Sequence, residues 1–215
     1  MITLKVLRYD PQKDEKPYHQ TYQVKLEPGM TVLDALIHIK ANIDSSLSFR
    51  HSCRMAICGS CAMFIHGLPR LACETQSVEL NTNEVVVEPL PNFPIVRDLV
   101  PDLISMLVKH HSVKPYIIRP DIREMEQPTG EFRQSREELE GYLQFSYCIK
   151  CGCCMAACPT LATSSLYAGP MPLTAAHRYN TDGRDGGFSV RAALPIDAPD
   201  EPEPDLSPSP AAEIS

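Results

Sequence analysis

The stretch "SCRMAICGSC", residues 52–61, holds three cysteines within nine positions, and a fourth follows in "LACE" at position 73. The spacing Cys53-x4-Cys58-x2-Cys61-x11-Cys73 matches the plant-type arrangement of ligands to a [2Fe–2S] cluster. Such a cluster needs a loop that folds tightly around it, and Gly59 permits close approach of a backbone whose amides can hydrogen-bond the sulfurs. The pattern therefore predicts a [2Fe–2S] site held by Cys53, Cys58, Cys61 and Cys73.

A structural zinc site is the main alternative for the same four cysteines. Zinc sites with four cysteine ligands usually show two C-x2-C pairs separated by a longer insert. Only Cys58 and Cys61 form such a pair here, so the spacing favours the cluster. Four cysteines leave no ligand position for the nearby His51 and His66, which are expected at the surface.

A second cysteine group lies at residues 148–159, in "CIKCGCCMAACP". It follows the pattern C-x2-C-x2-C-x3-C-P, in which the first three cysteines bind one iron–sulfur cube and the fourth binds another cluster. The first three are Cys148, Cys151 and Cys154, and the fourth is Cys158. Cys153 lies between ligands and is expected to be a packed thiol.

Composition narrows the classes of function. The 215 residues carry a formal net charge of −7, and residues 189–215 contain six acidic side chains and one basic side chain, Arg191. The remainder is too close to neutral to indicate nucleic-acid binding. All nine cysteines fall between positions 53 and 158, a clustering that suits metal better than a disulfide framework. No secretory signal is recognised at the N-terminus, so a reducing compartment is expected.

One uncharged stretch, residues 151–176, raises the question of a membrane span. Prolines, glycines and many Ser and Thr residues interrupt it. No transmembrane segment is therefore expected, and the stretch is better explained as a neutral surface against a partner or a cluster.

The spacing of apolar residues changes along the chain, from the period of strands to that of helices. Alternating apolar residues predict strands at 2–9 and 20–27, and shorter strands are expected in 62–67, 68–74 and 83–90. A helix is predicted over 31–42 with Thr31 as its cap, and further helices over 96–111, over 135–145 with a Ser135–Glu138 capping box, and around 173–180. Residues 114–134 are expected to be extended, and the proline-rich, acidic end to be disordered.

Taken together, these motifs resemble the iron–sulfur subunit of the succinate dehydrogenase/fumarate reductase family. The resemblance covers roughly residues 1–188 and rests on "SCRMAICGSC", "LACET", "VEPLPNFPIVRDLVPD", "KPY", "CIKCGCCMAACP" and "AAHRYNTDGRD". It implies an α+β protein with a β-grasp [2Fe–2S] ferredoxin domain over 1–94 and an incomplete α-helical ferredoxin domain over 95–188. The disordered tail would occupy 189–215.

The resemblance also implies a function within a complex. The family subunit docks on an FAD-containing flavoprotein that carries out the chemistry on succinate or fumarate. It passes electrons singly through [2Fe–2S], [4Fe–4S] and [3Fe–4S] centres to quinone at a membrane-anchor subunit. On matching positions, Cys148, Cys151 and Cys154 would bind [4Fe–4S], Cys158 would be one ligand of [3Fe–4S], and Pro159 would lie near the quinone. In a prokaryote the chain would lie at the cytoplasmic face of the inner membrane, held there by the complex.

One departure from the family pattern concerns the missing ligands. Family members have a second cysteine segment with two further [3Fe–4S] ligands and the fourth [4Fe–4S] ligand, whereas this chain has no cysteine after Cys158. The sequence thus predicts a truncated or frame-shifted C-terminus. Two alternatives to a complete electron relay stay open: a flavoprotein-docking [2Fe–2S] subunit whose second domain does not conduct, and a stand-alone ferredoxin-like carrier.

Overall fold

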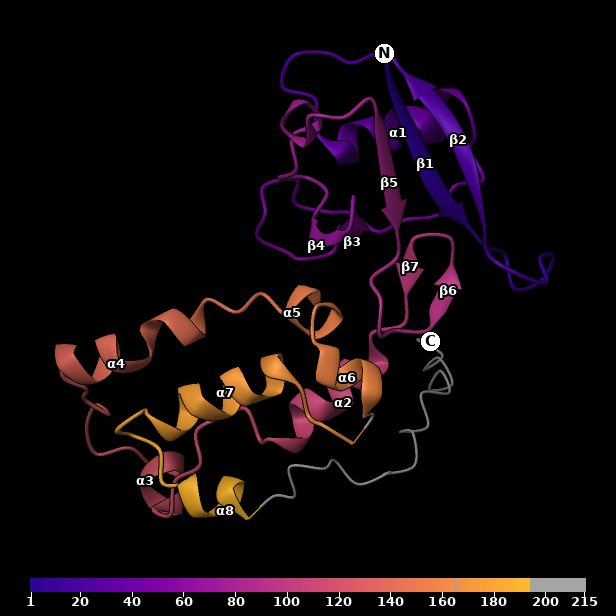
Figure 1. Ribbon diagram of the computed structural model, residues 1–215. Helices are drawn as coiled ribbons and strands as arrows, with labels where there is room; N and C mark the ends of the chain where they lie inside the picture. The colour runs from indigo at the N-terminus through magenta and orange to yellow at the C-terminus, as the bar shows by residue number, and fades with distance from the viewer. Residues whose placement is uncertain (165, 194–215) are drawn as a thin grey trace, which may run out of the picture.

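The computed structural model describes residues 1–164 and 166–193, which form two bodies joined by a short connection (Figure 1). The first body contains β1 (Ile2–Arg8), β2 (Tyr18–Val24), α1 (Val32–Asn42), β3 (Ala62–Ile65), β4 (Leu68–Leu71), a 3-10 turn (Ser77–Leu80) and β5 (Glu84–Glu88). The connection contains β6 (Ile95–Arg97) and β7 (Val100–Pro101). The second body contains α2 (Ile104–Ser112), α3 (Ile122–Glu126), α4 (Arg136–Ser146), α5 (Cys153–Ala156), α6 (Pro159–Thr163), α7 (Pro170–Asn180) and α8 (Phe188–Ala192).

The first body is a five-stranded mixed sheet packed against α1. Its strand order is β2-β1-β5-β3-β4, with β1 and β5 parallel and the other neighbours antiparallel. Alternate residues of β1 are buried, as the sequence pattern predicts, and they form one core with the apolar face of α1. Thr31 caps α1 in a capping box with Asp34, which confirms the predicted helix start.

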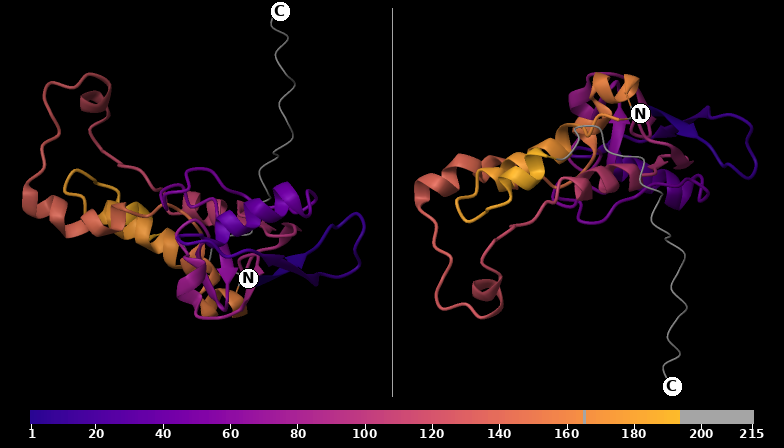
Figure 2. Two further views of the ribbon diagram at one scale, coloured as in Figure 1. Left: turned by 90° about the horizontal axis from the view of Figure 1, so that it is seen from above. Right: turned by 90° about the horizontal axis from the view of Figure 1, so that it is seen from below.

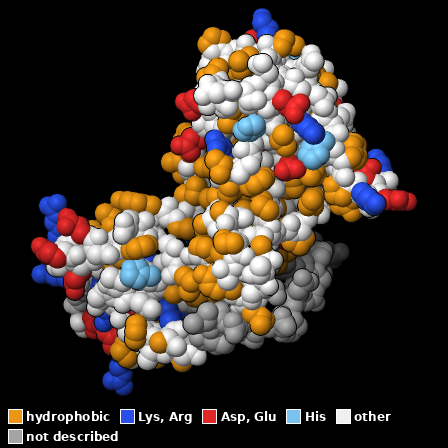
Figure 3. Space-filling view, in the orientation of Figure 1, with side chains coloured by type: hydrophobic (Ala, Val, Ile, Leu, Met, Phe, Trp, Pro, Cys, Tyr) orange, Lys and Arg blue, Asp and Glu red, His pale blue; other side chains and the backbone are white. Residues whose placement is uncertain are grey.

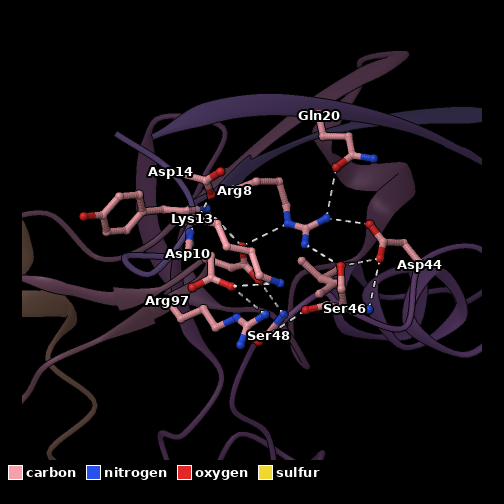
Figure 4. Close-up of polar contacts among 12 residues, drawn as sticks. Arg8, Asp10, Lys13, Asp14, Gln20, Asp44, Ser46, Ser48 and Arg97 are labelled. Atoms are coloured by element: carbon pink, nitrogen blue, oxygen red, sulfur yellow. Dashed lines mark hydrogen bonds and ion pairs between the residues drawn. The ribbon is translucent and has the colours of Figure 1, made fainter. Parts of the chain in front are cut away.

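The connection between the two bodies is fixed to the sheet by a buried polar network (Figure 4). The Arg8 guanidinium, at the end of β1, donates to Asp98 at 2.9 Å and to Asp44 at 2.5 Å. Asp98 also accepts the backbone N–H of Ser48 at 2.8 Å, in the segment that leads to the first cysteines. A single carboxylate therefore ties the interdomain connection to both the first strand and the cysteine loop.

The sequence pattern predicted one helix over residues 96–111, and this prediction is wrong for its first part. Residues 95–101 form the β6–β7 hairpin, and α2 begins only at Ile104. Asp98 has a φ of 46° at the hairpin turn, where its carboxylate reaches Arg8. Pro101 is also unfavourable in a helix interior because it lacks an N–H donor.

The second body is helical, with α7 packed against α2, α4 and α5. The predicted capping box of Ser135 and Glu138 is present at the start of α4. Residues 114–134, expected to be extended, also contain the short α3, and Figure 2 shows this segment looping away from the helices. Within the described residues, no helix has the length and apolar character needed to cross a membrane.

The expected boundary of the C-terminal tail at residue 189 is also wrong. Residues 188–192 form α8, and Arg191 is buried with its guanidinium paired to Asp185 at 2.7 Å. The Arg191 side chain also donates to the carbonyls of Lys114 and Tyr116, which fixes α8 to the rest of the body. The remainder of the predicted disordered tail, residues 194–215, lies outside the described residues.

Candidate functional site

The loop between α1 and β3 brings backbone amides to bear on cysteine sulfurs. Arg54, Ala56 and Gly59 all have positive φ, at 57°, 58° and 74°, a conformation that non-glycine residues rarely adopt. This path directs the N–H groups of residues 55, 57 and 58 toward Cys53 Sγ, at 3.3–3.4 Å, and the N–H of Ala56 toward Cys73 Sγ at 3.3 Å. Amide dipoles pointing at sulfur stabilise the thiolate form that a metal cluster requires.

The four cysteines of the first group lie in unequal environments. A hydrogen bond from Ser60 lowers the pKa of Cys58 to about 6, and Cys58 is exposed. Burial raises the pKa of Cys61 to about 11, and the neighbouring Cys73 also contributes to this shift. Ser60 was not predicted from the sequence, although a hydroxyl between Cys58 and Cys61 and adjacent to Cys61 is a recognisable signal. The structure brings the predicted residues together around one loop, with Cys58 on its solvent side and Cys61 on its core side.

The second cysteine loop is shaped by left-handed residues and by one asparagine. Lys150 and Gly152 have φ values of 55° and 84°, and Gly152 immediately precedes α5. The Asn92 side-chain amide donates to the carbonyls of Met155, Ala156 and Cys158 at 3.0–3.2 Å. Asn92 therefore holds the end of α5 from the interdomain connection. The sequence analysis missed it, and its place between Pro91 and Pro94 was the available signal.

The second loop carries Cys148, Cys151 and Cys154 within seven residues of sequence. Burial raises the pKa of Cys154, and the neighbouring Cys151 and Cys148 raise it further. A hydrogen bond from Cys153 lowers the pKa of Cys151 to about 6. Cys158 caps the start of α6, and Pro159 is the exposed first residue of that helix.

The two cysteine loops touch each other. A Cβ added at Gly59 would lie 2.9 Å from Cβ and 3.0 Å from Cα of Cys151, so only glycine fits there without displacing the neighbouring loop. Cys151 and Cys153 pack against an apolar cluster of Ala62, Leu90 and Ala156 that spans both bodies. Figure 1 shows the same approach, with α5 next to β3 and β4. Cys153 is thus a packed thiol at the junction.

The residues present suit the two clusters unequally. Around the first loop, three cysteines of the loop, Cys73 and an amide cradle match the donor set that a [2Fe–2S] cluster requires. For a [4Fe–4S] cube, which takes four thiolates, the second loop offers three, from Cys148, Cys151 and Cys154. For a [3Fe–4S] cluster, which takes more than one thiolate, it offers only Cys158. Nowhere in 1–164 and 166–193 are three or more Cys, His, Asp or Glu side chains arranged for a single metal ion.

Comparison with known proteins assigns the family. Residues 3–108 match the model of a 2Fe-2S iron-sulfur cluster binding domain. The chain is 44% identical to the fumarate reductase iron-sulfur subunit of Haemophilus influenzae, over 90% of this chain and 78% of that protein. The chain belongs to the fumarate reductase/succinate dehydrogenase iron–sulfur subunit family. This membership confirms the resemblance predicted from the motifs and makes the protein an iron–sulfur electron-transfer subunit of an oxidoreductase.

Other members of the family agree. The fumarate reductase iron-sulfur subunit of Mycobacterium tuberculosis is 44% identical, over 88% of this chain and 76% of that protein. The mitochondrial succinate dehydrogenase [ubiquinone] iron-sulfur subunit of Dictyostelium discoideum is 42% identical, over 90% of this chain and 69% of that protein. Among solved structures, a chain of the Mycobacterium smegmatis Sdh1 complex in the apo form superimposes with a TM-score of 0.78 and 26% identity, over 90% of this chain and 81% of that one. The predicted ferredoxin-type domain followed by a helical domain is therefore confirmed.

Proposed function

We propose that this subunit carries electrons singly between an FAD-containing flavoprotein acting on succinate or fumarate and quinone at a membrane-anchor subunit. Cys53, Cys58, Cys61 and Cys73 hold the [2Fe–2S] cluster at the flavoprotein end. The observation that carries the proposal is the contact of Gly59 with Cys151, because it places the first cluster loop directly against the second. Electrons leaving the first site therefore have the second cysteine loop as their nearest neighbour.

The second loop supplies ligands to the later centres in this proposal. Cys148, Cys151 and Cys154 bind the [4Fe–4S] cluster, Cys158 binds the [3Fe–4S] cluster, and Pro159 lies at the quinone end. Residues 1–215 contain no cysteine after position 158, so the proposal assigns no residue of this sequence to the remaining ligands of these two centres.

The surfaces of the subunit that would contact its partners in this proposal are apolar. Met55 and Ile57 flank the exposed Cys58 and are 69% and 64% exposed, which suits docking of the flavoprotein over the first loop. Figure 3 shows further hydrophobic side chains over the junction of the two bodies and over the second body. In a prokaryote, the complex would hold the subunit peripherally on the cytoplasmic face of the inner membrane.

Iron and acid-labile sulfide counts, combined with EPR spectroscopy of the purified subunit, test the assignment of ligands. Cys73→Ser should disturb the [2Fe–2S] signal, whereas Cys153→Ser, a matched change at a non-ligand cysteine, should leave that signal unchanged. An undisturbed spectrum in Cys73→Ser would show that the fourth ligand is wrong. About nine irons would support three clusters with ligands supplied from elsewhere, and two irons would restrict this polypeptide to the first cluster.

A second candidate function follows from the ligand count. With three thiolates for a four-thiolate cube, the second body would dock partners without conducting, and the chain would serve as a flavoprotein-binding [2Fe–2S] subunit. Co-purification of a flavoprotein, with succinate-dependent reduction of a dye and no reduction of quinone, would favour this function over the complete relay. Failure of any flavoprotein to co-purify would favour a stand-alone carrier.

A further inference from the structure

A cavity of about 530 Å³ opens at the end of α7, away from both cysteine loops. It lies where the base of the segment between α2 and α4 meets α7, and Figure 2 shows that segment looping outward. Three guanidinium groups and three aromatic rings dominate its lining: Arg119, Arg178, Arg184, Tyr116, Phe132 and Tyr179. Its volume falls in the range of small-molecule sites, and none of the described residues that line it is acidic.

Two of the cavity's arginines share a single acidic partner. Asp182, whose side chain is fully buried, pairs with both Arg178 at 3.0 Å and Arg184 at 2.8 Å. One carboxylate therefore faces these two guanidinium groups, while Arg119 pairs with Asp121 and also interacts with Glu124. Arg184 holds the pKa of Asp182 well below its usual range, so this carboxylate stays ionised. The wall formed by Arg178 and Arg184 therefore retains an excess of one positive charge.

Several N–H groups of Arg178 and Arg184 have no hydrogen-bond acceptor among the described residues. Within the described residues, Nη1 of Arg184 and both Nε and Nη2 of Arg178 make no hydrogen bond. The Arg178 guanidinium lies 4.3 Å from the Tyr179 ring centroid and 4.6 Å from that of Tyr142. Because the two rings fix its plane, its free N–H groups are oriented before any ligand arrives.

Aromatic side chains also line the cavity. Arg119 lies 4.2 Å from the centroid of the Phe132 ring, which is partly exposed, and Tyr116 is half-exposed. Aromatic rings at an open cavity favour flat apolar ligands through offset or edge-to-face packing. The site thus combines a single uncompensated charge with an aromatic surface.

We propose that this cavity binds a small organic monoanion, with one carboxylate held by Arg178 and Arg184 and a planar apolar body against Phe132 and Tyr179. Paired guanidinium N–H donors match the two oxygens of a carboxylate in geometry and charge. Binding there is independent of electron transfer, because none of the cysteines of either loop lines the cavity.

Isothermal titration of the full-length, iron-loaded subunit with 1-naphthoate tests the proposal, with 1-naphthamide as the uncharged control of equal shape. Naphthoate should bind at least tenfold more tightly than naphthamide. Arg184→Gln should weaken naphthoate binding about tenfold, and Arg136→Gln, which removes an exposed arginine of α4 outside the cavity, should leave it unchanged.

A second variant keeps the test independent of the Asp182 pairing. Phe132→Ala removes only the aromatic wall and should weaken both naphthoate and naphthamide severalfold while the EPR spectrum of the [2Fe–2S] cluster stays the same. Equal affinity for naphthoate and naphthamide would overturn the proposal. So would unchanged naphthoate affinity in both Arg184→Gln and Phe132→Ala.

Discussion

Replacing Gly59 by alanine separates the cost of a left-handed backbone from the cost of the contact between the two cysteine loops. At a φ of 74°, an alanine costs about 1–2 kcal/mol relative to glycine. Its Cβ would also lie 2.9–3.0 Å from Cβ and Cα of Cys151, and forcing such an overlap costs a further 1–3 kcal/mol, roughly. Gly59→Ala should therefore destabilise the subunit by about 2–5 kcal/mol.

Gly67 offers a matched control in the β3–β4 turn. Its φ is 82°, but nothing lies within 4 Å of a Cβ added there, so Gly67→Ala should cost only about 1–2 kcal/mol. In a chain of this length, the difference between the two variants corresponds to an unfolding midpoint about 2–12 °C lower for Gly59→Ala. Thermal unfolding under anaerobic conditions measures it, and EPR spectroscopy reports whether the first cluster site changes. Equal midpoints and identical spectra for the two variants would refute the contact between the loops.

Three further changes test other parts of the structure. Asp98→Asn leaves the buried charge of Arg8 short of one partner and should lower the free energy of unfolding by about 3 kcal/mol in urea at pH 7; a loss below about 1 kcal/mol would contradict the role of this pair. Burial and a hydrogen bond to Asp44 raise the pKa of Tyr22 to about 12, so its neutral form stabilises the fold fully below pH 10, and this contribution is lost as the pH rises through about 12. Tyr22→Phe should therefore lose less stability than the natural protein between pH 10 and 12, and parallel losses in the two proteins would count against the assignment. Ser135→Ala removes the cap of α4 and should cost about 1 kcal/mol by the same urea assay, whereas Ser135→Asp should restore most of it.

Local chemistry accounts for the features that the sequence predicted correctly. Capping boxes at Thr31 and Ser135 depend on residues three positions apart, and alternation along β1 depends on residues two apart. The prediction of a cluster site at Cys53, Cys58 and Cys61, which stays a prediction, likewise rests on the residues of one short loop. Such patterns are visible in sequence because the interacting groups are neighbours in the chain.

The features that escaped prediction depend on partners far along the chain. Asp98 lies in a hairpin turn from which its carboxylate pairs with Arg8. Because Arg8 is 90 residues away in the sequence, nothing in residues 96–111 signals that pairing. Arg191 is buried because Asp185 and two distant carbonyls receive its guanidinium, although the surrounding composition is that of a tail. For the candidate site, the spacing of the cysteines carried the prediction of their ligand roles, while the approach of Gly59 to Cys151 required the assembled fold.

The pairing of Arg8 with Asp98 also links the first strand to the second cysteine loop. The hairpin that precedes α2 is anchored on that strand through Asp98, and the strand itself pairs with β2 and β5 in the sheet. Asn92, a few residues before the hairpin, in turn holds the end of α5. A substitution at Arg8 is therefore expected to loosen the loop at residues 148–158, about 140 residues further along the chain.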